Sequence, residues 1–203
     1  ITTRARCCYQ SPNSVLRVFL LIVCPSSTVG WRASTKSWRR SQRRRRRLRR
    51  LNFSYAWSGL SSEGSATAAL QRQFIDENPF ALGDRDKLEV LKTGGRYSQA
   101  HQSHHPVLRT LGERGGYYDL FLIDNSGNVI YSVEKEADFA TNLLTGPYKS
   151  SGLSVAFQKV VQLATGELRE HAAFTAFEPY DPRAGAPARC VGRPVYSPFG
   201  TMT

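Results

Sequence analysis

Polar and aromatic side chains that could bind a small molecule gather between residues 131 and 148, with a second group further along the chain. The first group contains Asp138, Tyr148 and Lys135, and the second is Tyr180-Asp181. An aspartate with a nearby tyrosine suits an ammonium group, whereas Lys135 or Arg109 suits a carboxylate. Ordinary structural roles are the alternative, with Asp138 capping a turn and the tyrosines filling core edges. Asn142 has the same two interpretations.

No arrangement of residues indicates an enzyme. The chain has no Gly-x-Ser-x-Gly, no Cys/His spacing suited to nucleophilic catalysis and no glycine-rich phosphate loop. His101, His104 and His105 could form a metal site, because positions i and i+3 share a helix face, but Pro106 disturbs that helix and no Cys, Asp or Glu stands at a supporting spacing. We therefore expect solvated or pocket-edge histidines, with no metal and no cofactor.

The elements that would position these side chains can be read from hydrophobic periodicity. Residues 117–131 predict a hairpin, with apolar positions at period two on both sides of a turn at Asp124–Asn128. Helical patterns run over 65–77, 84–92 and 98–113, the last ended by Gly115-Gly116. Ser150 or Ser151 caps a further helix, and strands are expected at 170–177 and 188–196. This order predicts an α+β fold with an antiparallel sheet and helices to one side.

Charge divides the chain. The formal net charge is +12, but residues 1–62 contain none of the 16 acidic residues and half of the 28 basic ones. Residues 63–203 are therefore close to neutral. We expect residues 1–52, with the arginine run at 39–50, to be a disordered Arg/Ser-rich segment, since so many adjacent like charges cannot be buried. Residues 53–96 are expected to be a helical lead-in, and residues 97–203 the main module.

The basic segment allows three interpretations. It could bind nucleic acid or anionic lipid through its arginines, or it could be sequence that is not native to the protein. The near-neutral remainder argues against nucleic acid as a partner.

Residues 15–24 are apolar except for Arg17. This run is too short to span a bilayer and makes only a weak signal-peptide core. Cys190, alone in the globular part, is expected to be a small buried hydrophobe.

Residues 64–197 resemble the membrane-distal, PAS-like module of double Cache sensor domains, as found in bacterial methyl-accepting chemotaxis receptors. The likeness covers about two-thirds of the chain, with its motifs in the right order. Those that carry it are Leu70 to Pro79, Tyr97 to Arg109, Gly116 to Val133, Lys135 to Leu143, Gly146-Pro147-Tyr148, Ser151-Gly152-Leu153, Phe177 to Tyr180, and Gly185-Ala186-Pro187. Such receptors would continue with a last sheet strand, a second module and a transmembrane helix, so the sheet is expected to be incomplete at its C-terminal end.

The resemblance implies a function and a pocket. It implies an extracytoplasmic (periplasmic) sensing module anchored in the cell membrane by segments absent from this chain, dimeric in the full receptor, which relays binding of an amino acid, organic acid or amine. The same module could instead serve a histidine kinase or a cyclic-nucleotide enzyme, and a nucleic-acid-binding protein acting through the arginine run is the alternative from another class. The implied pocket residues are Tyr131, Lys135, Asp138, Asn142, Tyr148, Phe177, Tyr180 and Asp181.

Overall fold

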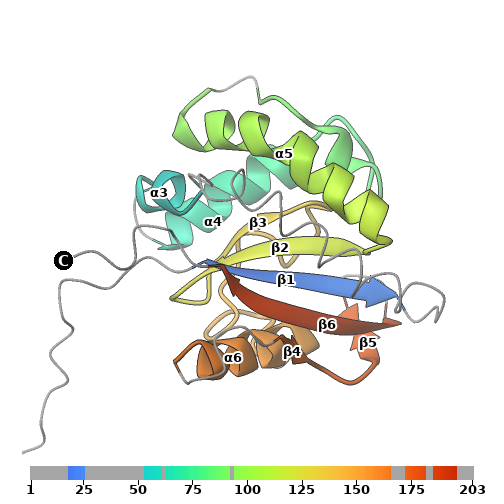
Figure 1. The fold of residues 1–203 in the computed structure, drawn as a ribbon. Helices are drawn as coiled ribbons and strands as arrows, with labels where there is room; N and C mark the ends of the chain where they lie inside the picture. Colours follow the sequence, from blue (N-terminus) through green and yellow to red (C-terminus); the bar gives the residue numbers. More distant parts are fainter. Residues whose placement is uncertain are drawn as a thin grey trace, which may run out of the picture.

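A six-stranded antiparallel sheet forms the centre of the molecule (Figure 1). The computed structural model describes residues 18–25, 53–60, 63–91, 94–165, 172–181 and 185–195. The strand order is β3-β2-β1-β6-β4, with β5 also paired to β6. The α+β class with an antiparallel sheet is thus confirmed, whereas helices lie on both faces of the sheet.

The hairpin at residues 119–132 has the predicted form. Strand β2 (Asp119–Asp124) pairs with β3 (Val129–Ser132), and Oδ1 of Asp124 accepts hydrogen bonds from the backbone of Ser126 at 2.9 Å and of Asn128 at 3.0 Å. Gly127, with φ of 87°, takes the left-handed conformation that the turn requires.

Strand β1 (Val18–Pro25) is the main departure from the sequence analysis. It lies between β2 and β6 and is antiparallel to both, with Val23 opposite Asp119 on one side and Cys190 on the other (Figure 1). The prediction that residues 1–52 are disordered is therefore wrong at 18–25. The consecutive residues Leu21, Ile22 and Val23 are all buried, so the sequence has no alternating pattern to mark a strand there, and the neighbouring arginines favoured the prediction of disorder. The remaining residues of that segment lie outside the described residues, as do residues 196–203, where the sheet was expected to be incomplete.

Three helices and two short helical turns cover one face of the sheet (Figure 1). They are α3 (Phe53–Ser58), α4 (Glu63–Gln71) continued by the π-helical turn η3 (Arg72–Asp76), the 3-10 turn η4 (Arg85–Lys87) and α5 (Arg96–Gly115). The predicted helix at 84–92 is thus reduced to one turn, whereas α5 continues through Pro106. Gly116 ends α5 in the left-handed conformation, as expected.

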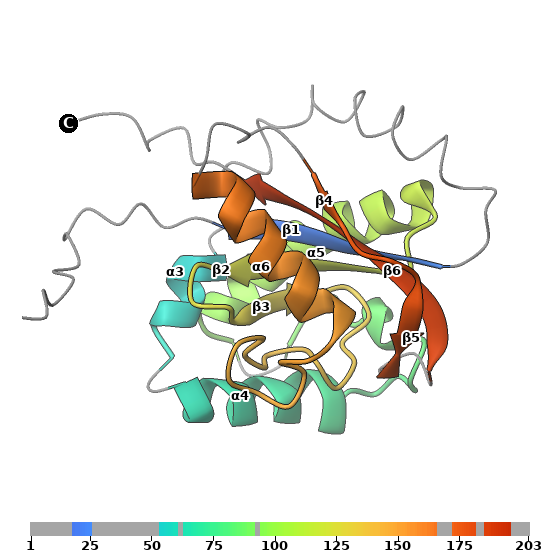
Figure 2. The same ribbon diagram turned by 90° about the horizontal axis from the view of Figure 1, so that it is seen from below.

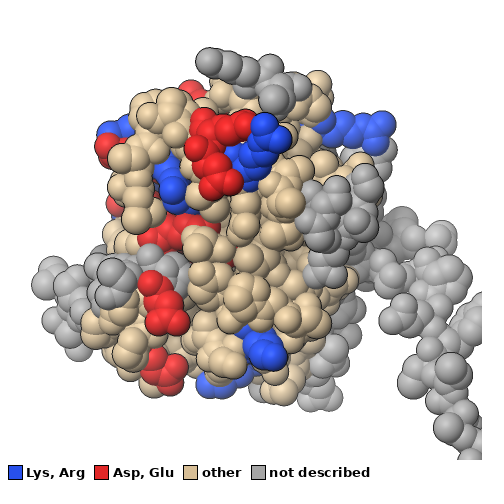
Figure 3. Space-filling model, turned by 180° about the vertical axis from the view of Figure 1, so that it is seen from behind, with Lys and Arg blue, Asp and Glu red and all other residues tan. Residues whose placement is uncertain are grey.

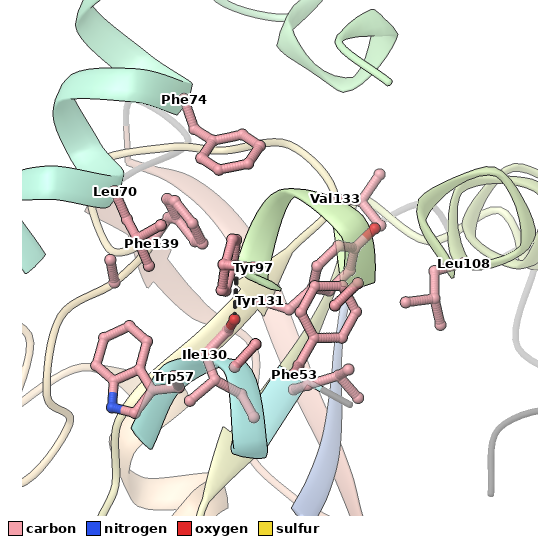
Figure 4. Close-up of a cluster of buried hydrophobic side chains, with 14 of the residues drawn as sticks. Phe53, Trp57, Leu70, Phe74, Tyr97, Leu108, Ile130, Tyr131, Val133 and Phe139 are labelled. Atoms are coloured by element: carbon pink, nitrogen blue, oxygen red, sulfur yellow. Dashed lines mark hydrogen bonds between the residues drawn. The ribbon is translucent and has the colours of Figure 1, made fainter. Parts of the chain in front are cut away.

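These helices pack against the sheet through an aromatic core, which we call the helix-face cluster (Figure 4). Tyr97 donates a hydrogen bond to the carbonyl of Ile130 at 2.7 Å, and Phe53 packs on Tyr131 with ring centroids 4.8 Å apart. The buried members are Ile22, Phe53, Ala56, Trp57, Ala66, Leu70, Phe74, Tyr97, Ala100, Leu108, Leu120, Leu122, Ile130, Tyr131, Val133, Phe139 and Ala140. The expected helical lead-in therefore shares its core with the sheet.

Helix α6 (Gly152–Thr165) covers the opposite face (Figure 2). Its start is confirmed, since the hydroxyl of Ser151 accepts a hydrogen bond from the backbone of Ser154 at 3.2 Å. The predicted strand at 170–177 is reduced to β4 (Ala173–Phe174), followed by β5 (Glu178–Tyr180), and β6 spans Ala186–Val195. Between β3 and α6, residues 133–151 form a loop that lies between α4 and α6 (Figure 2).

Candidate functional site

Asp138 is the centre of the candidate site. Its side chain is fully buried, and its carboxylate accepts a hydrogen bond from the hydroxyl of Tyr180, at the end of β5. The other carboxylate oxygen, Oδ1, is buried and accepts no hydrogen bond from any other described residue, although the backbone N–H of Asp138 itself also acts on the carboxylate. A buried polar atom without a partner is costly, so it is a marker for a missing ligand, ion or water.

The pKa of Asp138 is raised to about 8, mainly by burial and in addition by the negative charges of Asp119 and Glu136, whereas the hydrogen bonds from Tyr180 and from its own backbone N–H act in the opposite direction. The carboxyl group is therefore mostly protonated at neutral pH when nothing is bound. A cation placed against it would favour the ionised form.

Two further tyrosines lie near the acidic groups of this region, Tyr118 at Glu136 and Tyr148 within the electrostatic influence of Asp138. Tyr118 donates a hydrogen bond to the buried Glu136. Burial raises the pKa of Tyr148, with smaller contributions from the charges of Asp138, Asp181 and Glu136, so this phenol lies near the acidic groups. We use "Asp138 site" for Tyr118, Glu136, Asp138, Tyr148 and Tyr180, which come from the start of β2, the loop after β3 and the end of β5.

Lys135 lies on the other face of the sheet. Its side chain is fully buried, with Nζ donating to the carbonyls of Ser132 at 2.6 Å and Val133 at 3.1 Å and standing 4.8 Å from the centroid of the Tyr131 ring. Burial lowers the pKa of Lys135, opposed by the charges of Asp119, Glu134 and Asp86. These contacts place Lys135 in the wall of the helix-face cluster.

Tyr131 belongs to the same cluster through histidine contacts. His105 must donate its Nε2 hydrogen to the carbonyl of Asp86 at 2.6 Å, so its Nδ1 accepts the hydroxyl hydrogen of Tyr131 at 2.7 Å. Burial lowers the pKa of His105 to about 3 and that of the stacked His101 still further. Both imidazoles are neutral, and no group of three or more possible metal ligands occurs in the part of the chain that the structure describes.

Asn142 caps a turn, which was the alternative to ligand binding. Its Nδ2 donates to Oδ1 of Asn128 at 2.8 Å and to the carbonyl of Ser126 at 2.9 Å, and its Oδ1 accepts from the backbone of Leu144 and Thr145. The amide therefore fastens the loop to the hairpin turn.

The remaining predicted residues lie at the rim. Phe177 is 41 % exposed and stacks under Arg189, whose Cζ is 4.5 Å from the ring centroid. Asp181 is exposed after β5. Arg109, the other candidate carboxylate ligand, is paired with Asp86 at 2.8 Å and Glu113 at 3.2 Å.

Of the eight predicted residues, the structure brings together Asp138, Tyr148 and Tyr180 and separates them from Tyr131 and Lys135. Sequence reasoning missed Tyr118 and Glu136. A signal was available, because Glu136 stands between two selected residues and Tyr118 opens the predicted hairpin.

The surface is mixed in charge. In Figure 3 acidic and basic side chains are interspersed over the face shown, without a large area of one sign among the described residues. No helix among the described residues has the length and apolarity needed to cross a bilayer. No protein-family model matches this chain, and no significant match was found among curated proteins or solved structures.

Proposed function

We propose that this chain contains the extracytoplasmic ligand-sensing module of a transmembrane receptor, of the double Cache type used by methyl-accepting chemotaxis proteins. Its work is to bind a small molecule and relay the binding as a conformational change, without chemistry on the ligand. The motif likeness over residues 64–197 supports this, and an antiparallel sheet with helices is compatible with a PAS-like module. The described residues leave the output domain open, so a histidine kinase or cyclic-nucleotide enzyme could use the same module.

The observation that carries the proposal is the unpartnered Oδ1 of buried Asp138. An ammonium group would supply both the missing hydrogen-bond donor and the charge that a buried carboxylate requires. The phenols of Tyr148 and Tyr180 offer polar oxygens and aromatic surface to the same cation.

The charges around the Asp138 site narrow the class of ligand that it could bind. The charges that act on Asp138 and Tyr148 are all acidic, namely those of Asp119, Glu136, Asp138 and Asp181. The two cationic side chains considered for a carboxylate are occupied, Lys135 by backbone carbonyls and Arg109 by Asp86 and Glu113. A ligand with an ammonium group and no carboxylate fits this site best.

A thermal-shift titration of the full chain tests the proposal. Ethanolamine and putrescine should raise the melting temperature in a saturable, concentration-dependent manner, whereas acetate and succinate should not. Asp138→Asn should abolish the amine response, because a neutral amide cannot replace the charge. Asp76→Asn, the same change at an exposed position of η3, is the matched control and should leave the response intact.

Equal shifts for wild type and Asp138→Asn, or a response to the acids alone, would contradict the assignment of the site. Absence of any shift from a folded chain would remove the support for an amine sensor.

A further inference from the structure

The loop that carries Asp138 is fastened to helix α4 by side chains distant in the sequence. Gln71 donates from Nε2 to the carbonyl of Phe139 at 2.8 Å and to that of Ala137 at 3.1 Å. Thr67 donates its hydroxyl hydrogen to the carbonyl of Ala140 at 2.6 Å. These three carbonyls belong to the residues on both sides of Asp138, so α4 holds the backbone from which its carboxylate extends.

The held segment has an unusual backbone conformation. Lys135 and Ala140 are the described non-glycine residues with positive φ, at 57° and 62°. This conformation is unfavourable for a residue with a side chain, so outside contacts must maintain it at both positions. At Lys135 the contacts are its buried side chain and Arg85, whose Nη1 donates to the Lys135 carbonyl at 3.1 Å. At Ala140 the hydroxyl of Thr67 meets the carbonyl directly.

The helix itself is well placed for this task. Thr67 and Gln71 stand four residues apart and so share one face of α4. Ala66 and Leu70, their neighbours in sequence, are buried in the helix-face cluster and fix the helix against the sheet. The two donors therefore extend from a rigid support.

We propose that Gln71 and Thr67 are positioning residues of the Asp138 site: they touch no ligand, but they hold the 137–140 backbone so that the carboxylate of Asp138 meets Tyr180 with one oxygen left for a ligand. The predicted effect on ligand affinity rests on the proposed function, whereas the positioning of the loop does not. A ligand that draws on Asp138 pulls on backbone bonded both to α4, through Thr67 and Gln71, and to β3, through the Ala140 N–H and the Val129 carbonyl, so occupancy of the site is transmitted to both elements.

The test compares Thr67→Val, which removes the hydroxyl and keeps the shape, with Thr67→Ser, which keeps the hydroxyl. Gln71→Ala removes both hydrogen bonds that the Gln71 side chain donates to the loop. Gln102→Ala, the same change at an exposed position of α5, is its control. Two quantities are measured on the full chain: the pKa of the Asp138 carboxyl by ¹³C NMR titration, which needs no ligand, and the ethanolamine dissociation constant.

Thr67→Val and Gln71→Ala should each lower the pKa of Asp138 by about 1 unit, because a loosened loop admits water to the carboxyl group. Each should weaken ethanolamine binding about tenfold, because the free energy of one hydrogen bond that positions the loop corresponds to about that factor in affinity. Thr67→Ser and Gln102→Ala should match wild type in both quantities.

The inference is overturned if the pKa of Asp138 is unchanged in folded Thr67→Val, or if Thr67→Ser behaves as Thr67→Val does. A changed pKa in a chain whose wild type binds no ethanolamine would support the positioning role and reject the proposed ligand. An unchanged pKa together with tight ethanolamine binding by wild type would support the proposed ligand and reject the positioning role.

Discussion

Lys135 and Asp138 stand three residues apart in one loop, are a base and an acid and are both fully buried, yet their surroundings differ in kind. The ammonium group of Lys135 meets two carbonyls and the face of Tyr131. Asp138 has one hydrogen-bonded side-chain oxygen and one without a partner among the described residues. Burial of a charged group therefore does not by itself indicate a binding site here. The unmet hydrogen-bonding capacity of the Asp138 carboxylate does.

The two residues differ because their side chains meet different cores, although the backbone returns to the helix-face cluster at Phe139. Lys135 points among Phe74, Tyr131 and Phe139 of the helix-face cluster. Asp138 meets Tyr180, which packs with the core under α6. The comparison predicts that Lys135 is required for stability and Asp138 for binding.

The largest expected effect is on stability at Lys135. Lys135→Ala should lower the free energy of unfolding by about 3 kcal/mol, because it empties a packed site and leaves two buried carbonyls without their donor. Urea denaturation measures this. Lys149→Ala, at an exposed position, should stay within about 0.5 kcal/mol of wild type. A loss below 1 kcal/mol at Lys135 would break the comparison.

A smaller effect, with the opposite sign, is expected at Asp138. Its folded-state pKa, raised to about 8, lies above the ordinary value of 3.8, so the folded state binds the proton more tightly than the unfolded state. Wild-type stability attributable to this group is therefore full below about pH 4 and is lost as the pH rises towards 8. Asp138→Asn has no such loss, so its free energy of unfolding should exceed that of wild type at pH 8 and nearly equal it at pH 4.

Unfolding curves of both proteins at several pH values check this prediction. A stability difference that does not change with pH would show that Asp138 is not the titrating group, and would weaken the contrast with Lys135.

The smallest effect is expected for Tyr180→Phe. This change removes one hydroxyl and should lower the free energy of unfolding by about 1 kcal/mol. Because the Tyr180 hydrogen bond acts against the raised pKa of Asp138, its removal should move that pKa further up. Carboxyl titration by NMR in wild type and variant measures the direction, and a downward shift would show that Tyr180 does not favour the ionised form.

Much of the fold could be predicted from local patterns. The 119–132 hairpin, the end of α5 at Gly116 and the Ser151 cap of α6 depend on period-two alternation, a glycine in the left-handed conformation and a side-chain cap. The place of β1 could not be predicted, because it depends on pairing with strands about one hundred and more residues away.

The site followed the same rule. Asp138, Tyr148 and Tyr180 were selected by residue type, but their grouping depends on β5 returning to the loop after β3. Lys135 was selected for the same reason and lies elsewhere, because its left-handed backbone directs it into the opposite face. Residue type suggests which side chains could bind a ligand, and the path of the backbone decides which of them lie in the same site.

The central place of β1 has a consequence for the order of folding during synthesis. Val23 is made before its partner Cys190 on β6, which leaves the ribosome after nearly all the other described residues. The β2–β3 hairpin and α5 have local contacts and can form first, and β1 can then pair with β2. The other edge of β1, beside the buried Leu21, Ile22 and Val23, stays unpaired until β6 has been made, so this edge is open to wrong pairing during synthesis.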